Sequence, residues 1–170
     1  EGFSSFALGL LGTGWAVGYV AGCLRVPALV ARVGHIRSFS VMATLAAVSI
    51  LLSLLLMTPW AWIPLRALSG FCFAGAAMIV ESWLNERAEP STRGRVFGLY
   101  TMINLFASTG GQLILTLGAP RDDSFFILGA ILYCLALVPL AISSTETPKA
   151  LVSVRLDLKV LWRNSPVAVL

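Results

Sequence analysis

An arginine, Arg66, lies within an apolar segment that carries no other charge. If this segment crosses a bilayer, a guanidinium there costs on the order of several kcal/mol unless it is paired or hydrated. One interpretation is that Arg66 serves a hydrated path through the membrane. The other is that its long side chain reaches the headgroups, about a turn and a half away. No acidic residue of the chain lies at the same depth, so we expect any partner to lie on a helix outside this chain.

A glutamate, Glu81, follows Arg66 by 15 residues on the same predicted helix. At 100° and 1.5 Å per residue, the two side chains are roughly 60° and about 22 Å apart. They share a face but cannot touch. The position of Glu81 near one membrane surface fits a gate or a proton site, and it equally fits a solvated helix end.

Four polar residues recur at every fourth position of a later apolar segment, which places them on one helix face. They are Tyr100, Asn104, Ser108 and Gln112. Such a stripe must face protein or water. It can form hydrogen bonds between helices, or it can line a path for a solute.

Signatures of soluble enzymes and metal sites are missing from the sequence. His35 is the only histidine and lies in a basic loop, so an intramembrane hydrolase of the Ser/His type or a histidine-rich metal site has no candidate pair. No glycine-rich loop precedes a lysine at the spacing of a nucleotide site. The cysteines have no paired spacing and lie in apolar segments, at Cys23, Cys72 and Cys134. We therefore expect no catalytic residue, metal or cofactor.

The composition is that of a membrane protein. Hydrophobic residues make up 58% of the chain and charged residues 12%, against about 25% charged in soluble domains. A hydrocarbon core of roughly 30 Å requires about 20 apolar residues per helix. Five segments meet this requirement or nearly so, at about 3–24, 39–57, 61–80, 96–118 and 125–143. We predict an all-α, polytopic helical fold, then a cytoplasmic loop over 144–165 and the start of another span at 166–170.

Basic residues determine the expected orientation, because short cytoplasmic loops are enriched in Lys and Arg. Ten of the 12 follow the first, third and fifth spans. These connections are therefore predicted to be cytoplasmic, and the first span to begin outside. The basic residues form no patch interleaved with exposed aromatics, which argues against a nucleic-acid partner.

Glycines mark the expected helix contacts. In the first span they repeat every four residues, at Gly14, Gly18 and Gly22, and so allow a neighbouring backbone to approach closely. Static packing and a helix that rocks against its partner both fit this pattern. Gly110 and Gly111 in the fourth span are expected to allow close packing or a local bend.

Residues 27–37 resemble the signature loop between helices two and three of the major facilitator superfamily, Gly-x-Leu-x-Asp-Arg-x-Gly-Arg-Arg. Leu29, Arg32 and Gly34 match this pattern, and Arg37 lies nearby. Ala31 replaces the aspartate, so the charge network of that loop is altered here. Pro27 replaces the first glycine, and His35-Ile36 replace the two arginines.

Two further stretches resemble motifs of the same family in order and spacing. Leu65 to Gly70 is similar to the helix-four motif that combines an intramembrane arginine with a glycine. Residues 86–94 are similar to the next cytoplasmic loop. Because both loops are predicted to lie on the cytoplasmic face and carry opposite charges, we expect them to form a gate in which Arg32 or Arg37 pairs with Glu86 or Glu89. The expected gate residues are Arg32, Gly34, His35, Arg37, Glu86, Glu89, Arg93 and Gly94.

The resemblance implies helices two to six of a twelve-helix transporter, with the first helix and the C-terminal half missing, and is strongest to the YcaD-like bacterial group. It implies a secondary transporter in the bacterial inner membrane, working by alternating access and coupled to protons or another ion. The expected partners are the lipid bilayer, a small-molecule substrate, protons and the missing half. A non-transporting scaffold or sensor, and a membrane enzyme with its chemistry elsewhere, are the alternatives.

Overall fold

Five helices make up the described part of the protein. The structure is a computed structural model that describes residues 4–117 and 123–142, and no strand occurs within these ranges. The predicted all-α class is confirmed. The predicted loop over 144–165 and the next span at 166–170 lie outside the described residues. The helices are α1 (Ser5–Val33), α2 (His35–Leu55), α3 (Pro59–Arg87), α4 (Arg93–Leu117) and α5 (Ser124–Ile142).

The helices extend beyond the predicted spans at the end that carries most of the arginines. α1 continues to Val33, so the segment after residue 24 is helical where a loop was expected, and Pro27 lies inside the helix. α3 likewise continues to Arg87. The prediction counted only residues apolar enough for the bilayer, whereas a helix can continue into the polar interface. Arg32 and Arg87 lie in the last turns, where a cation interacts favourably with the helix dipole.

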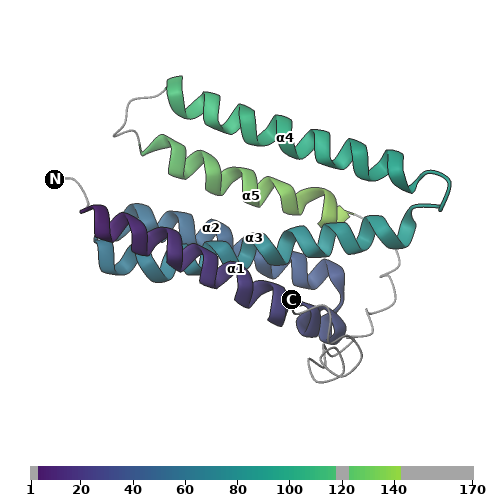
Figure 1. Cartoon of the computed structure of the whole chain (residues 1–170), viewed down its shortest axis with the longest axis horizontal. Helices are drawn as coiled ribbons and strands as arrows, with labels where there is room; N and C mark the ends of the chain where they lie inside the picture. The colour runs from purple at the N-terminus through teal and green to yellow at the C-terminus, as the bar shows by residue number, and fades with distance from the viewer. Residues whose placement is uncertain (1–3, 118–122, 143–170) are drawn as a thin grey trace, which may run out of the picture.

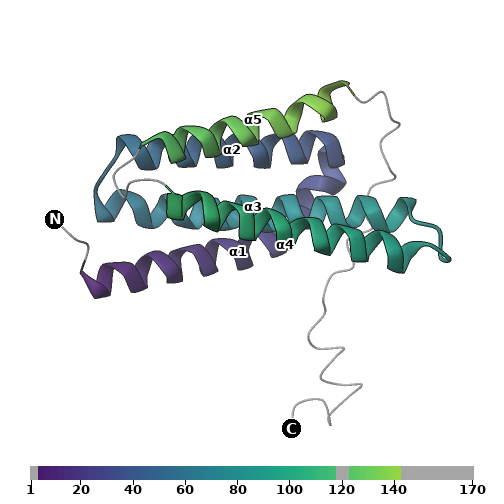
Figure 2. The ribbon, with the colours of Figure 1, turned by 90° about the horizontal axis from the view of Figure 1, so that it is seen from above.

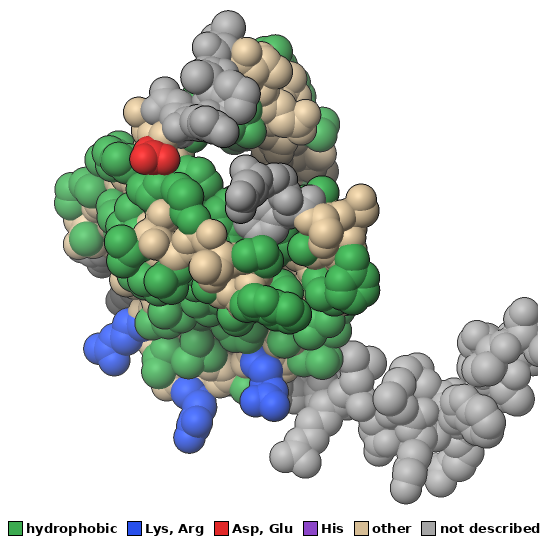
Figure 3. Space-filling view, turned by 90° about the vertical axis from the view of Figure 1, so that its left-hand side faces the viewer, with side chains coloured by type: hydrophobic (Ala, Val, Ile, Leu, Met, Phe, Trp, Pro, Cys, Tyr) green, Lys and Arg blue, Asp and Glu red, His purple; other side chains and the backbone are tan. Residues whose placement is uncertain are grey.

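The surface of this helical assembly is apolar. α1, α2, α3 and α5 are each long and apolar enough to cross a membrane, and α4 has 25 residues. Large side chains such as Phe106 and Ile142 are 73% and 77% exposed. Figure 3 shows one face of the molecule, on which hydrophobic side chains predominate over charged ones. Apolar surface on this scale indicates contact with lipid or with further helices.

The helices differ in how closely they pack. α3 packs against α1 and α2, α5 packs against α2, and α4 contacts the other helices mainly through α3. Figure 1 shows α4 running along the outside of the group, apart from α1, and Figure 2, seen from above, shows it lying over α3. α4 is therefore the helix with the least coverage among the five.

The contact between α1 and α3 depends on the glycine repeat of α1. A Cβ atom at Gly14 would lie 3.1 Å from a carbonyl oxygen of α3, and one at Gly22 would lie 2.7 Å from another. A Cβ at Gly18 would overlap a third carbonyl outright. The contacted carbonyls repeat every four residues as the glycines do, and belong to Ile63, Ala67 and Phe71. The two helices therefore run parallel with their backbones in direct contact.

Gly70 of α3 plays the same part for α3 that the three glycines play for α1. A Cβ atom at Gly70 would overlap the carbonyl group of Trp15, on α1. Neither helix can carry a side chain at this level without moving the other. Backbone contact of this kind is typical of helix pairs in membranes, where small residues increase the packing area.

Hydrogen bonds join α2 to α3 away from the end of the helices that carries Arg32 and Arg87. The buried Ser49 hydroxyl donates to the carbonyl of Leu65 at 2.8 Å and lies 3.0 Å from the Ser69 hydroxyl. The Trp62 indole N–H donates to the carbonyl of Ser53 at 2.8 Å. Polar side chains thus bond across the helix interface, where hydrocarbon offers no alternative partner.

Gly34 alone joins α1 to α2. It has φ 86°, the one positive φ among the described residues, and a side chain would be strained there. Its N–H donates to the carbonyl of Val30 at 2.8 Å, and its own carbonyl accepts from the N–H of Ser38 at 3.1 Å. The helix elbow, residues 33–38, is therefore a tight turn held by backbone hydrogen bonds.

The α1–α3 contact generates a stability prediction. We expect Gly18→Ala to lower the free energy of unfolding of the full-length protein by about 1–3 kcal/mol, because overpacking forces backbones apart. Gly12→Ala is the matched control, since a Cβ there meets no atom within 4 Å and alanine favours a helix by up to about 1 kcal/mol. Unfolding by SDS titration in mixed micelles measures both. Equal effects of the two substitutions would contradict the assigned contact.

Candidate functional site

Arg66 lies exposed on α3. Within the described residues its guanidinium has neither an ion pair nor a hydrogen bond, and the same ranges place no acid beside it. A charge without a partner in an apolar helix is the feature that most needs explanation by function. Its role stays a prediction.

An aromatic cluster lies between α1 and α3 on the side of Arg66. Its ring centroids are 5.3 Å apart for Trp15 and Tyr19, 6.0 Å for Trp15 and Phe73, and 6.4 Å for Tyr19 and Phe73. Phe73 follows Arg66 by seven residues, which puts the two on one side of α3, about 10 Å apart along its axis. The sequence analysis did not select Phe73, although this spacing was visible.

Glu81 is the next charge along α3, and it is exposed. It lies within range of an electrostatic interaction with Tyr100 of α4. The fold therefore brings Glu81 to the Tyr100 end of the polar stripe. Arg66 has no such link to the stripe among the described residues.

Only part of the polar stripe of α4 has hydrogen-bond partners in the described residues. Tyr100 is half-buried, and the three residues after it in the stripe are exposed. The Asn104 amide donates to the carbonyl of Tyr100 at 2.9 Å, within its own helix. In the part of the chain that the structure describes, Ser108 and Gln112 make no side-chain hydrogen bond. From Asn104 onward the stripe is exposed in the described part of the chain, so either predicted role requires a neighbour outside that part.

The second pair of glycines has no neighbour in the described ranges. A Cβ atom at Gly110 or Gly111 would meet nothing within 4 Å. Their expected packing contact is therefore absent from the described residues and stays a prediction, in contrast to the contacts of the α1 glycines.

The two loops of the predicted gate meet through a histidine and not through the expected arginines. His35 Nε2 lies 4.0 Å from a carboxylate oxygen of Glu86, whereas the described residues show no ion pair between Arg32 or Arg37 and either acid of the second loop. His35 Nε2 also lies 3.3 Å from the hydroxyl of Ser82, which the sequence analysis did not select. Ser82 precedes Glu86 by one helical turn, and that spacing was the available signal.

Two other residues of the predicted gate lie at the start of α4. The Arg93 guanidinium donates to the carbonyl of Asn85 at 3.5 Å, which ties the start of α4 to the end of α3. Gly94 has open space around it.

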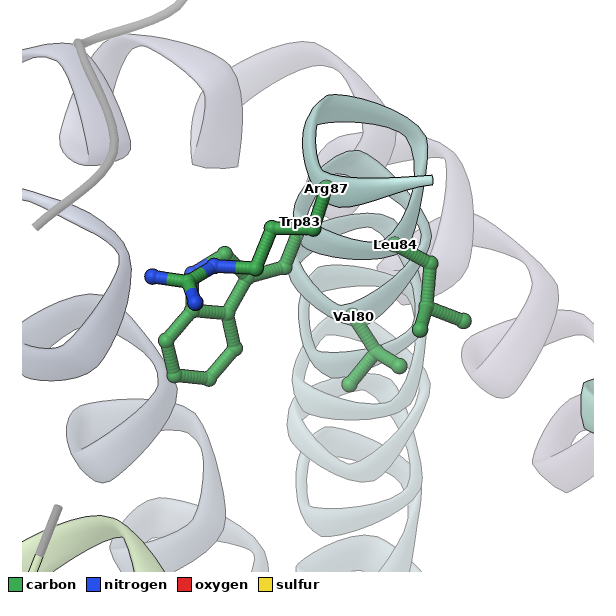
Figure 4. A pocket seen from close by; sticks show the side chains of 4 residues that line it. All are labelled: Val80, Trp83, Leu84 and Arg87. Carbon is green, nitrogen blue, oxygen red and sulfur yellow. The ribbon is translucent and has the colours of Figure 1, made fainter. Parts of the chain in front are cut away.

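A shallow cavity of about 270 Å³ lies beside the same end of α3. Figure 4 shows its lining, with Trp83 and Arg87 extending to the left of the helix, Val80 in front of it and Leu84 on its right. All four residues belong to α3, so the cavity is a groove along one helix. The indole N–H of Trp83 is buried without a hydrogen-bond partner in the described part of the chain. Within that part, no three His, Cys, Asp or Glu side chains come together as a metal site.

Comparison with known proteins agrees with this architecture. The profile of the Major Facilitator Superfamily matches residues 2–170. An uncharacterised MFS-type transporter of Yersinia pestis (strain Pestoides F) is 25% identical over 136 residues, which cover 80% of this chain and 36% of that protein. The same values hold for an uncharacterised MFS-type transporter of Yersinia pseudotuberculosis serotype O:1b (strain IP 31758). No solved structure matches the chain significantly.

The chain thus spans about a third of the length of these relatives, which are named as transporters and not as enzymes. Neither match specifies the YcaD-like group, which stays a prediction. The profile match covers nearly every residue, and the apolar helices, the parallel glycine contact and the intramembrane arginine lie within it. This chain belongs to the Major Facilitator Superfamily.

Proposed function

We propose that the full-length protein carries a small solute across the membrane by alternating access, coupled to protons or another ion. The observation that carries the proposal is Arg66, an exposed charge on an apolar helix that has no partner among the described residues. Retaining such a charge costs free energy that a neutral residue would not. A transport path offers a reason for it, because there the charge faces water or solute.

The surroundings of Arg66 support a solute path. A fixed positive charge can hold an anionic group of the solute, or stabilise a nearby carboxylate in its ionised form. The cluster of Trp15, Tyr19 and Phe73 supplies flat apolar walls on the same side of α3. Binding sites commonly combine apolar walls with a few placed polar groups.

Two further elements complete the proposed path. Glu81 acts at its cytoplasmic end, as a gate or proton site. The stripe of α4 forms a polar wall along it, through Tyr100, Asn104, Ser108 and Gln112. The rest of the full-length protein forms the opposite wall, as in transporters whose two halves rock about a central site.

The α1–α2 elbow and the α3–α4 loop form the proposed cytoplasmic gate. Arg32 or Arg37 pairs with Glu86 or Glu89 when the cytoplasmic side is closed. Exposed pairs contribute only about 0–1 kcal/mol each, so such pairing shifts the balance between two conformations and does not hold the fold together. Gly34, His35, Arg93 and Gly94 belong to the same gate.

The membrane orientation gives a prediction that needs no substrate. In a bacterial inner membrane, we expect a cysteine at Thr58 to react with an impermeant thiol reagent from outside, and one at Ser91 to be protected. The two positions flank α3 at its opposite ends, and the arginine-rich end should be cytoplasmic. Labelling of intact cells, after replacement of the three native cysteines, measures this. Reaction at Ser91 before permeabilisation would reverse the orientation.

Transport itself can be tested without knowing the solute. Liposomes that contain the full-length protein and an imposed pH gradient are incubated with a mixture of small cellular metabolites, and their contents are analysed by mass spectrometry. We expect at least one solute to accumulate, and a protonophore to abolish its accumulation. No enrichment over protein-free liposomes, in either direction of the gradient, would favour a scaffold or sensor.

Arg66 should be the residue whose loss reduces this transport most. We expect Arg66→Ala to abolish accumulation while membrane insertion stays normal, because the path loses its fixed charge. Arg66→Lys keeps a point charge but loses the planar fork of donors. Partial activity would therefore indicate an electrostatic role, and no activity would indicate bidentate binding.

Arg95→Ala is the matched control for Arg66→Ala, since Arg95 is an exposed arginine at the start of α4 and should tolerate the change. The same solute assay, normalised to inserted protein, compares the variants. Native accumulation by Arg66→Ala would leave headgroup contact as the better explanation of this arginine.

A further inference from the structure

The helix elbow carries a buried ionisable side chain that faces α3. His35 is fully buried, at 0% exposure, while the Glu86 side chain is 28% exposed. Its Nε2 atom lies 3.3 Å from the Ser82 hydroxyl and 4.0 Å from the Glu86 carboxylate. One ring nitrogen thus faces a hydroxyl and a carboxylate that lie one turn apart on α3. The elbow and the end of α3 therefore meet through His35.

The second ring nitrogen has no partner. His35 Nδ1 is buried without a hydrogen bond in the described part of the chain. A cavity of about 20 Å³ adjoins the ring, which is room for one water molecule. Apart from His35, its lining is apolar and comes from α1 and α3, through Val26, Pro27, Val30, Met78 and Ile79. The cavity thus offers no polar side chain besides His35.

Among the described residues, Glu86 is the one charged side chain that His35 contacts. On α3 the ring faces Glu86, and on α1 it faces apolar side chains. On α2 the nearby Ser38 is buried and neutral. The arginines of the elbow, Arg32 and Arg37, are exposed and do not pair with Glu86 within the described ranges. Glu86 is thus available to respond to the charge of His35.

We propose that the elbow is a proton-dependent latch, in which protonated His35 clamps the α1–α2 connection to the end of α3 through Glu86. The imidazole takes one proton from cytoplasmic water, and both ring nitrogens then carry hydrogen. The contact between Nε2 and the carboxylate becomes a charge-assisted hydrogen bond, which is shorter and stronger than a neutral one. Loss of the proton leaves the weaker contact with Ser82.

Two features make this contact suitable as a switch. Histidine is the side chain that ordinarily changes charge between pH 5 and 8. His35 directly follows Gly34, which has a positive φ and is the single residue between the two long helices α1 and α2. A small change in the hold on His35 therefore changes the position of the elbow relative to α3. The latch does not rest on solute transport, and its test measures conformation alone.

The test measures a distance across the latch at several pH values. Spin labels are placed at two exposed positions, Val41 on α2 and Asn85 on α3, in the full-length protein without its native cysteines and in lipid nanodiscs. Pulsed electron–electron double resonance gives the distance distribution. We expect the short-distance population to rise at least about threefold between about pH 8 and about pH 5.5, as the histidine gains its charge.

Variants identify the groups responsible. We expect His35→Gln and Glu86→Gln to remove the pH response, because each removes one charge of the pair. Asp123→Asn is the control for loss of one exposed acid, since Asp123 has no contact with His35 in the described residues and lies outside the proposed gate, and it should keep the native response.

Two results would overturn the latch. One is a distance distribution of the labelled parent protein that does not change with pH. The other is a full pH response in Glu86→Gln. The second result is decisive even if His35→Gln does not fold, because Glu86 is partly exposed and its amide has nearly the same shape.

Discussion

The direct backbone contact between α1 and α3 is the constraint on which the arrangement of the described helices depends. Gly18 and Gly70 leave no room for a side chain between the two helices. Because the helices run parallel at this distance, the rings of Trp15 and Tyr19 come beside Phe73, on the side of α3 that carries Arg66. The aromatic cluster beside Arg66 is thus positioned by glycines, which have no side chains.

Polar groups of the described helices fall into two classes. Those of Ser49 and Trp62 bond across the α2–α3 interface, as hydrocarbon requires of a stable helix pair. Those of Arg66, Ser108 and Gln112 have no side-chain partner in the described part of the chain. The first class explains how the helices are held together. The second class is where function is expected, because a polar group retained without a structural partner needs water, solute or another helix.

The limits of the sequence analysis have physical causes. The number of helices followed from apolar run lengths, but their ends did not, because α1 and α3 continue through the interface to Val33 and Arg87. Pairing across the two loops of the predicted gate was expected from charge, and charge alone could not select a partner for Glu86. The loops meet through buried His35, which local sequence presents as one more residue of a basic loop. Spacing alone could place Phe73 on the face of Arg66 and Ser82 on that of Glu86, but their contacts come from a second helix, which the sequence does not place.

The sequence by itself determined the membrane class, the helix count and the orientation expected from its basic residues, because these depend on composition and on the period of a single helix. It also marked Arg66, since a charge in an apolar run is recognisable without coordinates. Only the tertiary structure decided which faces meet. The same every-fourth spacing describes the glycines of α1 and the stripe of α4, yet Gly18 lies against a neighbouring backbone while Ser108 and Gln112 are exposed. Helical periodicity defines a face, and only the placement of a second helix defines its partner.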